Sequence, residues 1–271
     1  MLRIRKKQIL WKKRATALFL AFSVMIGLAH NTQAGALAQS DTGADTDPTK
    51  PVVFSVREEF YNPKGDLWRY AFILRADKAI LKNKGKLSGK RGFLLRSDLP
   101  IVIARAGSSE NMGLGDLYAQ ALWFPYLTRK FGFATGSGLS APTATDKLLG
   151  AGKWQIAPAA IPVWFFDRQG LFFVKFQDYL SFGGNSNRAD IHYTNVDATF
   201  LWKLKRKWWI VTDTEMNANW KKGGSTGFKS GLMIGRMLNP TFGVWLKPEI
   251  PYGGDGGGGW ILKSSFFWVR P

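Results

Sequence analysis

The sequence predicts an all-β protein, a transmembrane antiparallel up-and-down β-barrel of about 12 strands that follows an N-terminal signal peptide. Two observations carry this prediction. Short runs with a period of two recur through most of the 271 residues, and the connections between them alternate between short and long. Transmembrane barrels have amphipathic strands of this kind, with short turns at one end and longer loops at the other.

The alternation is clearest in residues 207–220. One face is uncharged and has a tryptophan near each end; it comprises Trp208, Ile210, Thr212, Thr214, Met216, Ala218 and Trp220. The other face is more polar; it comprises Trp209, Val211, Asp213, Glu215, Asn217 and Asn219. A helix would scatter both sets around its circumference, whereas a strand separates them. The first face suits lipid, although a soluble β-sandwich strand with one solvated face has a similar pattern.

Most of these runs are close to the roughly 9–11 residues that a tilted transmembrane strand needs. We expect strands at 52–61, 67–78, 91–104, 115–127, 131–140, 154–166, 171–182, 190–203, 207–220, 227–237, 242–251 and 260–270. The runs 67–78, 190–203 and 242–251 repeat the two-faced pattern of 207–220. The polar faces of these four strands supply the candidate lumen-lining residues, which are Arg69, Arg75, Asp197, Lys203, Asp213, Glu215, Lys247 and Glu249.

The connections also fit a barrel. Four are short, at 128–130, 167–170, 204–206 and 239–240, whereas four are longer and rich in Gly, Ser or Asn, at 141–153, 183–189, 221–226 and 253–259. The short turns are expected on the periplasmic side and the longer loops outside the cell. Residues 79–90 do not fit, because this long basic segment falls where a periplasmic turn is expected. It leaves open that the first two strands are misassigned.

The N-terminus has the pattern of a secretory signal peptide. Seven basic residues precede the apolar run 15–29, which is shorter than the roughly 20 residues of a membrane-spanning helix. Cleavage is expected after Ala38, or after Ala34, and an uncleaved anchor is the alternative. We therefore expect a signal peptide at 1–38, a disordered periplasmic lead-in at 39–51 and an outer-membrane barrel at 52–271.

Net charge and composition limit the kinds of partner that we expect. Removing residues 1–38 leaves 31 basic and 19 acidic side chains, a formal charge of +12. Basic charge can indicate nucleic-acid binding, but an exported chain seldom meets nucleic acid. We expect instead outer-membrane lipid and lipopolysaccharide, a small-molecule solute and the barrel-insertion machinery. The sequence has no Cys, which excludes disulfides and thiolate metal sites.

Residues 113–158 contain motifs that resemble a known family. They are Gly113-Leu114-Gly115-Asp116-Leu117, then Pro142-Thr143-Ala144-Thr145, then Leu149-Gly150-Ala151-Gly152-Lys153-Trp154-Gln155 and Pro158. In this order they are similar to the outer-membrane β-barrel family labelled as transporters of phenol meta-cleavage pathways. The resemblance implies a barrel in the outer membrane of a diderm bacterium and uptake of small, weakly polar molecules. Taken alone, the residues describe a turn, a long loop and the start of a strand.

The sequence predicts no enzyme. Barrel lipid hydrolases use His with Ser, and His192 is the one histidine of the mature chain. It lies near Ser186, but its neighbourhood shows no signature of those enzyme families, so a solvated or headgroup-contacting side chain is expected. A single His excludes a His-based metal site, and Gly113-x-Gly115 lacks the third Gly of a dinucleotide loop. We expect no cofactor and no catalytic, cofactor-binding or metal-binding residues.

The predicted function is a passive channel or transporter in the cell outer membrane for small molecules, hydrophobic or aromatic ones included. A 12-stranded barrel lies between filled eight-stranded barrels and open porins, so its lumen can be open or blocked by side chains. A structural or lipopolysaccharide-contacting barrel without transport is the alternative. A barrel lipid hydrolase that uses His192 is a less expected third.

Overall fold

The computed structural model describes residues 52–62, 67–83, 90–166, 169–254 and 258–269. The predicted signal peptide and lead-in lie outside these residues. The strands are β1 (Val52–Asn62), β2 (Leu67–Asn83), β3 (Lys90–Ala106), β4 (Ser109–Leu114), β5 (Leu117–Leu127), β6 (Phe131–Ala141), β7 (Lys153–Phe166), β8 (Gly170–Gly184), β9 (His192–Lys203), β10 (Trp208–Asn219), β11 (Ser225–Met237), β12 (Phe242–Tyr252) and β13 (Trp260–Val269). Two single-turn 3-10 helices, η1 (Lys205–Lys207) and η2 (Trp220–Lys222), follow β9 and β10. Within the described ranges, no helix is long and apolar enough to span a membrane.

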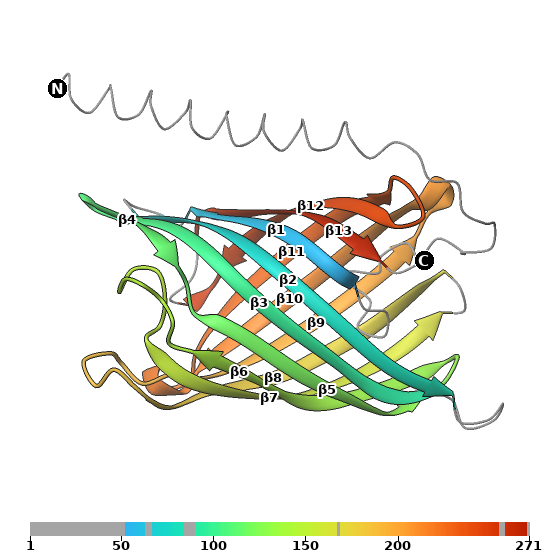
Figure 1. Ribbon diagram of the computed structural model, residues 1–271, viewed down its shortest axis with the longest axis horizontal. Helices are drawn as coiled ribbons and strands as arrows, with labels where there is room; N and C mark the ends of the chain where they lie inside the picture. The colour runs from blue at the N-terminus through green and yellow to red at the C-terminus, as the bar shows by residue number, and fades with distance from the viewer. Residues whose placement is uncertain (1–51, 63–66, 84–89, 167–168, 255–257, 270–271) are drawn as a thin grey trace, which may run out of the picture. The chain divides into compact units, whose positions relative to one another are not determined.

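The strands form one closed antiparallel barrel (Figure 1). Strands that are neighbours in sequence pair with each other, and β1 pairs with both β2 and β13, so the sheet closes on itself. β3 pairs with β5 along its first half and with β4 along its second half. β4 and β5 therefore share one place in the wall, and the predicted 12-stranded up-and-down barrel is confirmed.

Most strand boundaries shift by only a few residues, but the structure departs from the prediction more clearly at β4 and at β2 and β3. β4 was not predicted, because its mostly polar, exposed residues show no apolar alternation. It is separated from β5 by Gly115 and Asp116, and the Gly115 N–H donates to the carbonyl of Pro100 over 2.9 Å. β2 and β3 are each 17 residues long and stay paired as far as Asn83 and Lys90. Residues 79–83 and 90 of the basic segment are therefore strand, whereas 84–89 lie outside the described residues; the Lys residues of the segment interrupted the apolar alternation by which strands were recognised.

The two ends of the barrel differ. β1 begins and β13 ends at one end, which we call the N/C end; the short turns after β5, β7, β9 and β11 lie there too (right in Figure 1). The longer connections after β6, β8 and β10 lie at the opposite end, which we call the loop end. Because outer-membrane barrels have short periplasmic turns, the N/C end corresponds to the predicted periplasmic side.

The outward faces of the strands are apolar and aromatic. Trp260 and Trp268 face outward near opposite ends of β13, and 46% and 38% of their surfaces are exposed. In β10, Thr212 and Thr214 are exposed whereas the alternate residue Asp213 is buried. A closed sheet with exposed indoles at both ends of a strand has the surface that lipid requires, because neighbouring strands satisfy one another's backbone groups without a free edge and the aromatic rings lie at the interfaces.

Candidate functional site: the interior of the barrel

Apolar side chains fill the half of the lumen next to the N/C end. Trp209 and Phe267 are fully buried there, with ring centroids 5.8 Å apart in an edge-to-face arrangement. They belong to one buried cluster with Leu94 and Phe124 from the β3–β5 side of the wall. Since its members come from strands all around the barrel, this cluster closes the axial path at that level. We call it the apolar plug.

A belt of charged side chains lies next to the apolar plug. Four of its members occupy one row of the sheet register across β8, β9, β10 and β11: Lys175, Asp197, Glu215 and Lys229. The Lys229 ammonium lies 3.1 Å from the Glu215 carboxylate. The Lys175 ammonium lies 3.9 Å from the Asp197 carboxylate. The signs in this row are +, −, −, +, so each carboxylate has a lysine beside it.

Glu249 is the most buried acid of the belt, with no side-chain surface exposed. The ammonium groups of Lys247, Lys263 and Lys229 lie 2.7, 3.1 and 3.4 Å from its oxygens. Lys247 also lies 2.6 Å from Asp213. A buried carboxylate without such neighbours would lose several kcal/mol of solvation, so this part of the belt is held together by its own charges.

The belt continues on β1, where the Arg57 guanidinium lies 3.3 Å from the Glu59 carboxylate, and across β2 and β3 as two further arginine pairs. Arg75 donates two hydrogen bonds of 2.7 Å to Asp98. Arg96 donates bonds of 2.9 and 2.7 Å to Asp77. The two pairs between β2 and β3 are bidentate, the strongest geometry for a guanidinium and a carboxylate.

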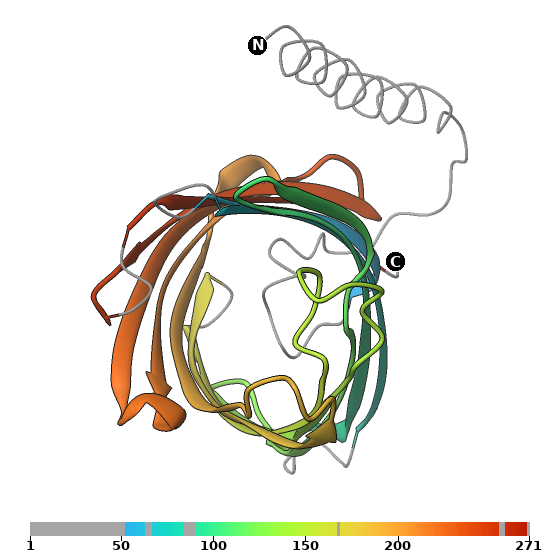
Figure 2. The same ribbon diagram turned by 90° about the vertical axis from the view of Figure 1, so that its left-hand side faces the viewer.

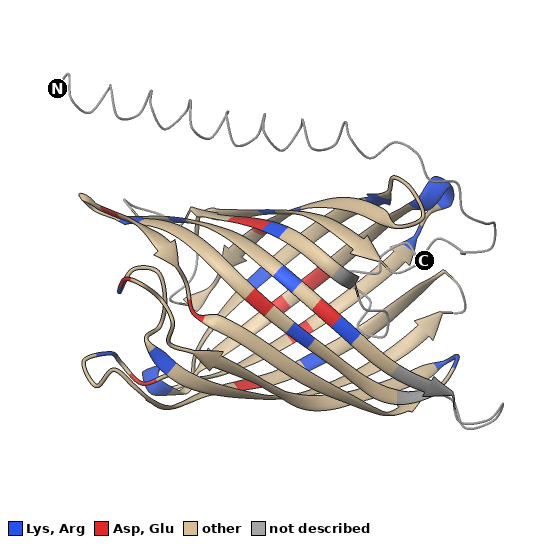
Figure 3. Cartoon of the chain, viewed as in Figure 1, with Lys and Arg blue, Asp and Glu red and all other residues tan. Residues whose placement is uncertain are grey.

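The belt has no net charge. Its seven basic members are Arg57, Arg75, Arg96, Lys175, Lys229, Lys247 and Lys263, and its seven acidic members are Glu59, Asp77, Asp98, Asp197, Asp213, Glu215 and Glu249. Figure 3 shows these residues as a band of mixed blue and red across the middle of the strands. The interior surface is strongly polar here, but it does not favour ions of one sign.

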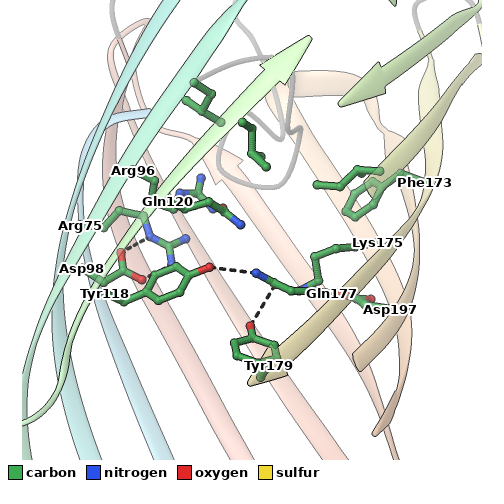
Figure 4. A pocket seen from close by; sticks show the side chains of 13 residues that line it. Arg75, Arg96, Asp98, Tyr118, Gln120, Phe173, Lys175, Gln177, Tyr179 and Asp197 are labelled. Carbon is green, nitrogen blue, oxygen red and sulfur yellow. Dashed lines mark hydrogen bonds and ion pairs between the residues drawn. The ribbon is translucent and has the colours of Figure 1, made fainter. Parts of the chain in front are cut away.

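A cavity of 370 Å³ lies where the belt meets the apolar plug (Figure 4). Its apolar wall is Leu94, Leu122, Ile161 and Phe173, and its polar wall is Arg75, Arg96, Asp98, Tyr118, Gln120, Lys175, Gln177, Tyr179 and Asp197. The volume is within the range of small-molecule pockets, roughly 300–1,000 Å³. Because its basic groups are paired with carboxylates, the cavity suits an uncharged molecule with an apolar body and a polar group.

Gln177 connects the two sides of the cavity. Its side-chain amide donates to the Tyr118 hydroxyl over 3.0 Å and to the carbonyl of Ala157 over 3.3 Å. Its carbonyl accepts a hydrogen bond of 2.9 Å from the Tyr179 hydroxyl. Tyr118 is on β5 and Gln177 on β8, so this chain of hydrogen bonds crosses the interior past β6 and β7, as Figure 4 shows.

The loop between β6 and β7, residues 142–152, folds into the loop end of the barrel (yellow-green in Figure 2). Asp116 holds it, since its carboxylate accepts from the N–H groups of Ala144, Ala151 and Gly152 over 3.1, 2.5 and 3.3 Å. Leu149, only 1% exposed, packs in a buried cluster with residues of β2 and β3. The motifs in residues 113–152 therefore come together as one structural unit, a loop and its anchor.

The loop between β8 and β9 braces the β6–β7 loop. The Arg188 guanidinium donates to the carbonyls of Ala151, Lys147 and Gly150. In the same loop, Asp190 accepts a hydrogen bond of 2.9 Å from Lys153. This bond, with the positive charges of Lys153 and then Lys221, lowers the pKa of the Asp190 carboxyl. The loop end is thus tied together by side chains from two loops.

The predicted lumen residues fall into two groups. Arg75, Asp197, Asp213, Glu215, Lys247 and Glu249 all take part in the belt. Arg69 and Lys203 lie on β2 and β9 away from it: Arg69 is exposed opposite Tyr61, and Lys203 is opposite Trp209 near the N/C end.

Sequence reasoning did not single out several belt and cavity residues. Arg96 and Asp98 alternate with outward residues of β3, and Lys175, Gln177 and Tyr179 do so on β8. The same period-two analysis applied to the runs 91–104 and 171–182 could have found them. Tyr118 also alternates with outward residues of β5, but its hydrogen bond to a partner 59 residues away has no local signal in the sequence.

His192 has an acidic neighbour rather than a nucleophile. In the described part of the chain its Nε2 lies 3.4 Å from Asp178, whose other oxygen accepts from the Thr194 hydroxyl over 2.7 Å. The Thr194 oxygen in turn accepts a bond from the Trp220 indole. Ser186, the hydroxyl near His192 in sequence, is not part of this group. Among the described residues, there is also no cluster of three His, Asp or Glu that could hold a metal ion.

No family model and no curated protein matches the sequence. Solved structures do match: the COG4313 outer membrane channel from Pseudomonas putida F1 is 11% identical, with a TM-score of 0.63 over 88% of this chain and 100% of that chain. The NanC porin is 8% identical, with a TM-score of 0.56 over 80% and 100%. The KdgM porin is 9% identical, with a TM-score of 0.54 over 80% and 99%. At these identities the likeness establishes the fold alone.

The barrel is an outer-membrane protein. Its outer surface, described above, is that of a lipid-facing sheet, and single-chain barrels with such surfaces lie in outer membranes. The matched structures are porin-like barrels of that membrane.

Proposed function

We propose that the protein is a passive outer-membrane transporter for small, weakly polar molecules, aromatic ones included. The observation that carries the proposal is the 370 Å³ cavity, in which an apolar wall faces hydroxyl, amide and charge-balanced groups. A phenol-like molecule could place its ring against Phe173 and its hydroxyl near Tyr118 and Gln177. The resemblance of residues 113–158 to the phenol meta-cleavage family supports the same class of solute.

The interior does not favour a wide aqueous pore or a polyanion. The apolar plug lacks the polar lining that ions require, and the belt has equal numbers of both signs. The KdgM porin has been solved in complex with disordered oligogalacturonate, a polyanion. A lumen suited to such a ligand would need an excess of unpaired cations, whereas the belt cations lie beside carboxylates. Lipid, lipopolysaccharide and the barrel-insertion machinery belong to the same proposal as partners.

A barrel without transport is the second candidate, because the hydrogen bonds of Gln177 and the apolar plug both obstruct the lumen. A lipid hydrolase is disfavoured, since His192 contacts Asp178 and no hydroxyl is poised for attack on the described chain. Transport and its absence are separable by measuring uptake of N-phenyl-1-naphthylamine, an apolar dye that fluoresces in phospholipid and that lipopolysaccharide delays. Cells with the barrel in their outer membrane should take up the dye faster than cells without it.

Two variants on β7 sharpen this experiment. Ile161→Trp places an indole in the cavity and should return dye uptake to the level of cells without the barrel. Ile156→Trp, on the outward face of the same strand, should leave uptake unchanged. Heat-modifiable migration on gels checks that both variants fold. If the unchanged barrel gives no increase in uptake, the protein is not a transporter of this class.

A further inference from the structure

An acidic side chain stands on the lipid-facing side of β1. Glu58 lies between Arg57 and Glu59, whose side chains belong to the belt inside the barrel. Because successive residues of a strand point to opposite faces, Glu58 points outward with Phe54, whose surface is 38% exposed. Glu58 itself is partly exposed. An ionisable group directed at lipid is costly, and such residues are most often retained for a function.

Hydroxyl groups from the two neighbouring strands bond to Glu58. The Ser264 hydroxyl on β13 donates to its Oε2 over 3.2 Å, and the Tyr70 side chain on β2 is also hydrogen-bonded to it. Both partners share its outward face, since Ser264 is opposite Glu58 in the register and Tyr70 is opposite Phe60. A carboxylate has about four lone-pair sites, so it can accept further hydrogen bonds from outside the protein.

Glu58 lies close to the loop end of the membrane-facing surface. Phe60 is two residues nearer that end, and its ring lies 6.4 Å from the Trp68 ring and 5.1 Å from the Trp260 ring. Indoles of this kind mark the membrane interface. Two residues of a strand span about 7 Å, so Glu58 stands just inside that interface, where acyl chains begin. The loop end is the predicted extracellular side, and the leaflet on that side is the one that contains lipopolysaccharide.

A second outward acid, Asp178 on β8, has a different environment. One of its oxygens accepts from the Thr194 hydroxyl over 2.7 Å, and the other lies 3.4 Å from Nε2 of His192. Both oxygens of Asp178 therefore have partners within the chain, one of which becomes a cation when it is protonated. Glu58 has only hydroxyl partners, and within the described ranges no cation forms an ion pair with it. It is thus the better acceptor for a group that belongs to the membrane.

We infer that Glu58, together with Ser264 and Tyr70, is a contact site for lipid A, the acylated disaccharide of lipopolysaccharide. Lipid A has amide N–H and acyl-chain hydroxyl groups where its chains join the sugars, which is the depth at which Glu58 stands. Phospholipids have only ester carbonyls at that depth, and these accept hydrogen bonds but donate none. Bonds to a carboxylate are about twice as strong as those between neutral groups. The inference rests on the part of the proposed function that names lipopolysaccharide as a partner, and it does not depend on transport.

The test measures how much lipid A stabilises the natural protein and its variants. Urea titration gives the unfolding midpoint in phosphatidylcholine vesicles with and without purified lipid A. The shift caused by lipid A should be smaller in Glu58→Leu than in the natural protein, and intermediate in Glu58→Gln, whose carbonyl still accepts. Loss of the bonds to Ser264 and Tyr70 affects both kinds of vesicle and cancels in this comparison. The control is Phe72→Leu, opposite Glu58 on the outward face of β2, which should show the full shift.

Vesicles with phosphatidylglycerol distinguish acyl-chain donors from charge. This lipid is anionic but has no amide or acyl hydroxyl, so its shift should be the same in the natural protein and in Glu58→Leu. A larger shift in the natural protein here would assign the effect to charge and overturn the inference. Equal shifts with lipid A in these two proteins would also overturn it. A second copy of the barrel on this face would instead make the difference depend on the protein-to-lipid ratio, with the same consequence. Dye uptake tests transport independently, so either proposal can fail while the other stands.

Discussion

Gln177 and Tyr118 are hydrogen-bonded over 3.0 Å, although two strands separate them in the barrel wall. The bond crosses the interior at the cavity, so a solute that occupies the cavity must displace it or bond to its members. An amide and a phenol are well suited to this, since each can donate and accept and can re-form the bond after a solute leaves. This hydrogen bond therefore obstructs the cavity reversibly.

Removing the hydrogen bond between Gln177 and Tyr118 should speed transport. Tyr118→Phe deletes the hydroxyl and leaves Gln177 bonded to Tyr179 and Ala157. A net hydrogen bond is worth about 1 kcal/mol, which corresponds to a roughly fivefold faster dye uptake if breaking the bond limits the rate. Tyr126→Phe, at an exposed site on the same strand, is the control. Slower or unchanged uptake in Tyr118→Phe would show that the bond does not limit passage.

The apolar plug should be what prevents ion flow. Trp209→Ala removes the largest fully buried side chain of the plug, whereas the control Trp208→Ala alters the outward face of the same strand. Single-channel conductance in planar bilayers should be small for the natural protein and for Trp208→Ala, and larger for Trp209→Ala. If the natural protein conducts as well as Trp209→Ala, water already fills this part of the lumen.

The two faces of β10 predict opposite responses to charge changes. Thr214→Arg places a cation on the lipid face and should destabilise the protein in vesicles, lowering its free energy of unfolding by roughly 2–4 kcal/mol. Asp213→Asn neutralises an inward acid and should cost less, because Lys247 keeps its contact with Glu249. Asn removes the negative charge at position 213 and adds nothing else, whereas a lysine there would also repel Lys247. Denaturant titration measures the free energy of unfolding of both variants. A larger loss in Asp213→Asn than in Thr214→Arg would mean that the faces are inverted.

Asp116 should control the order of the β6–β7 loop. Asp116→Ala leaves three N–H groups without their acceptor, and an unpaired buried donor costs about 1–3 kcal/mol. We expect proteolytic cleavage within residues 142–152 to become faster. Asp146→Ala removes a carboxylate of the same loop that accepts from the N–H of Leu148 and from the side chain of Asn111 on β4, so it takes away fewer bonds to the loop backbone and cleavage should change less. Equal protection in both variants would assign the anchor to Arg188 instead.

Acid should loosen the loop end. The lowered pKa of Asp190 means that its ion pair with Lys153 stabilises the fold at pH values above the ordinary value of 3.8. This contribution is lost as the pH falls through the lower folded value, because the carboxyl then becomes protonated. The protection of the amides of residues 188–191, which is their exchange rate relative to the intrinsic rate at the same pH, should therefore fall on acidification through that lower value. In Asp190→Asn the exchange should already be fast at neutral pH and show no further step.

The sequence was sufficient for the wall of the barrel but not for its interior. Alternation around Trp208 and Trp209 separated an outward from an inward face because the side-chain period of a strand is two. The pairing of Gln177 with Tyr118 depends on barrel diameter and register, which no local pattern contains. Likewise the motif containing Asp116 was visible, but its partners Ala144 and Ala151 come from a loop whose inward fold only the assembled barrel defines.

The absence of net charge in the belt has a consequence for how far its field extends. Each charge of the belt lies beside one of opposite sign, at distances comparable to the spacing between strands, about 4.8 Å, so their potentials cancel within a few ångströms of the wall. The Debye length in 0.1 M salt is about 10 Å, longer than that cancellation distance. Added salt therefore has little left to screen, and the wall acts on the dipole of a molecule that touches it rather than on the charge of one that passes at a distance.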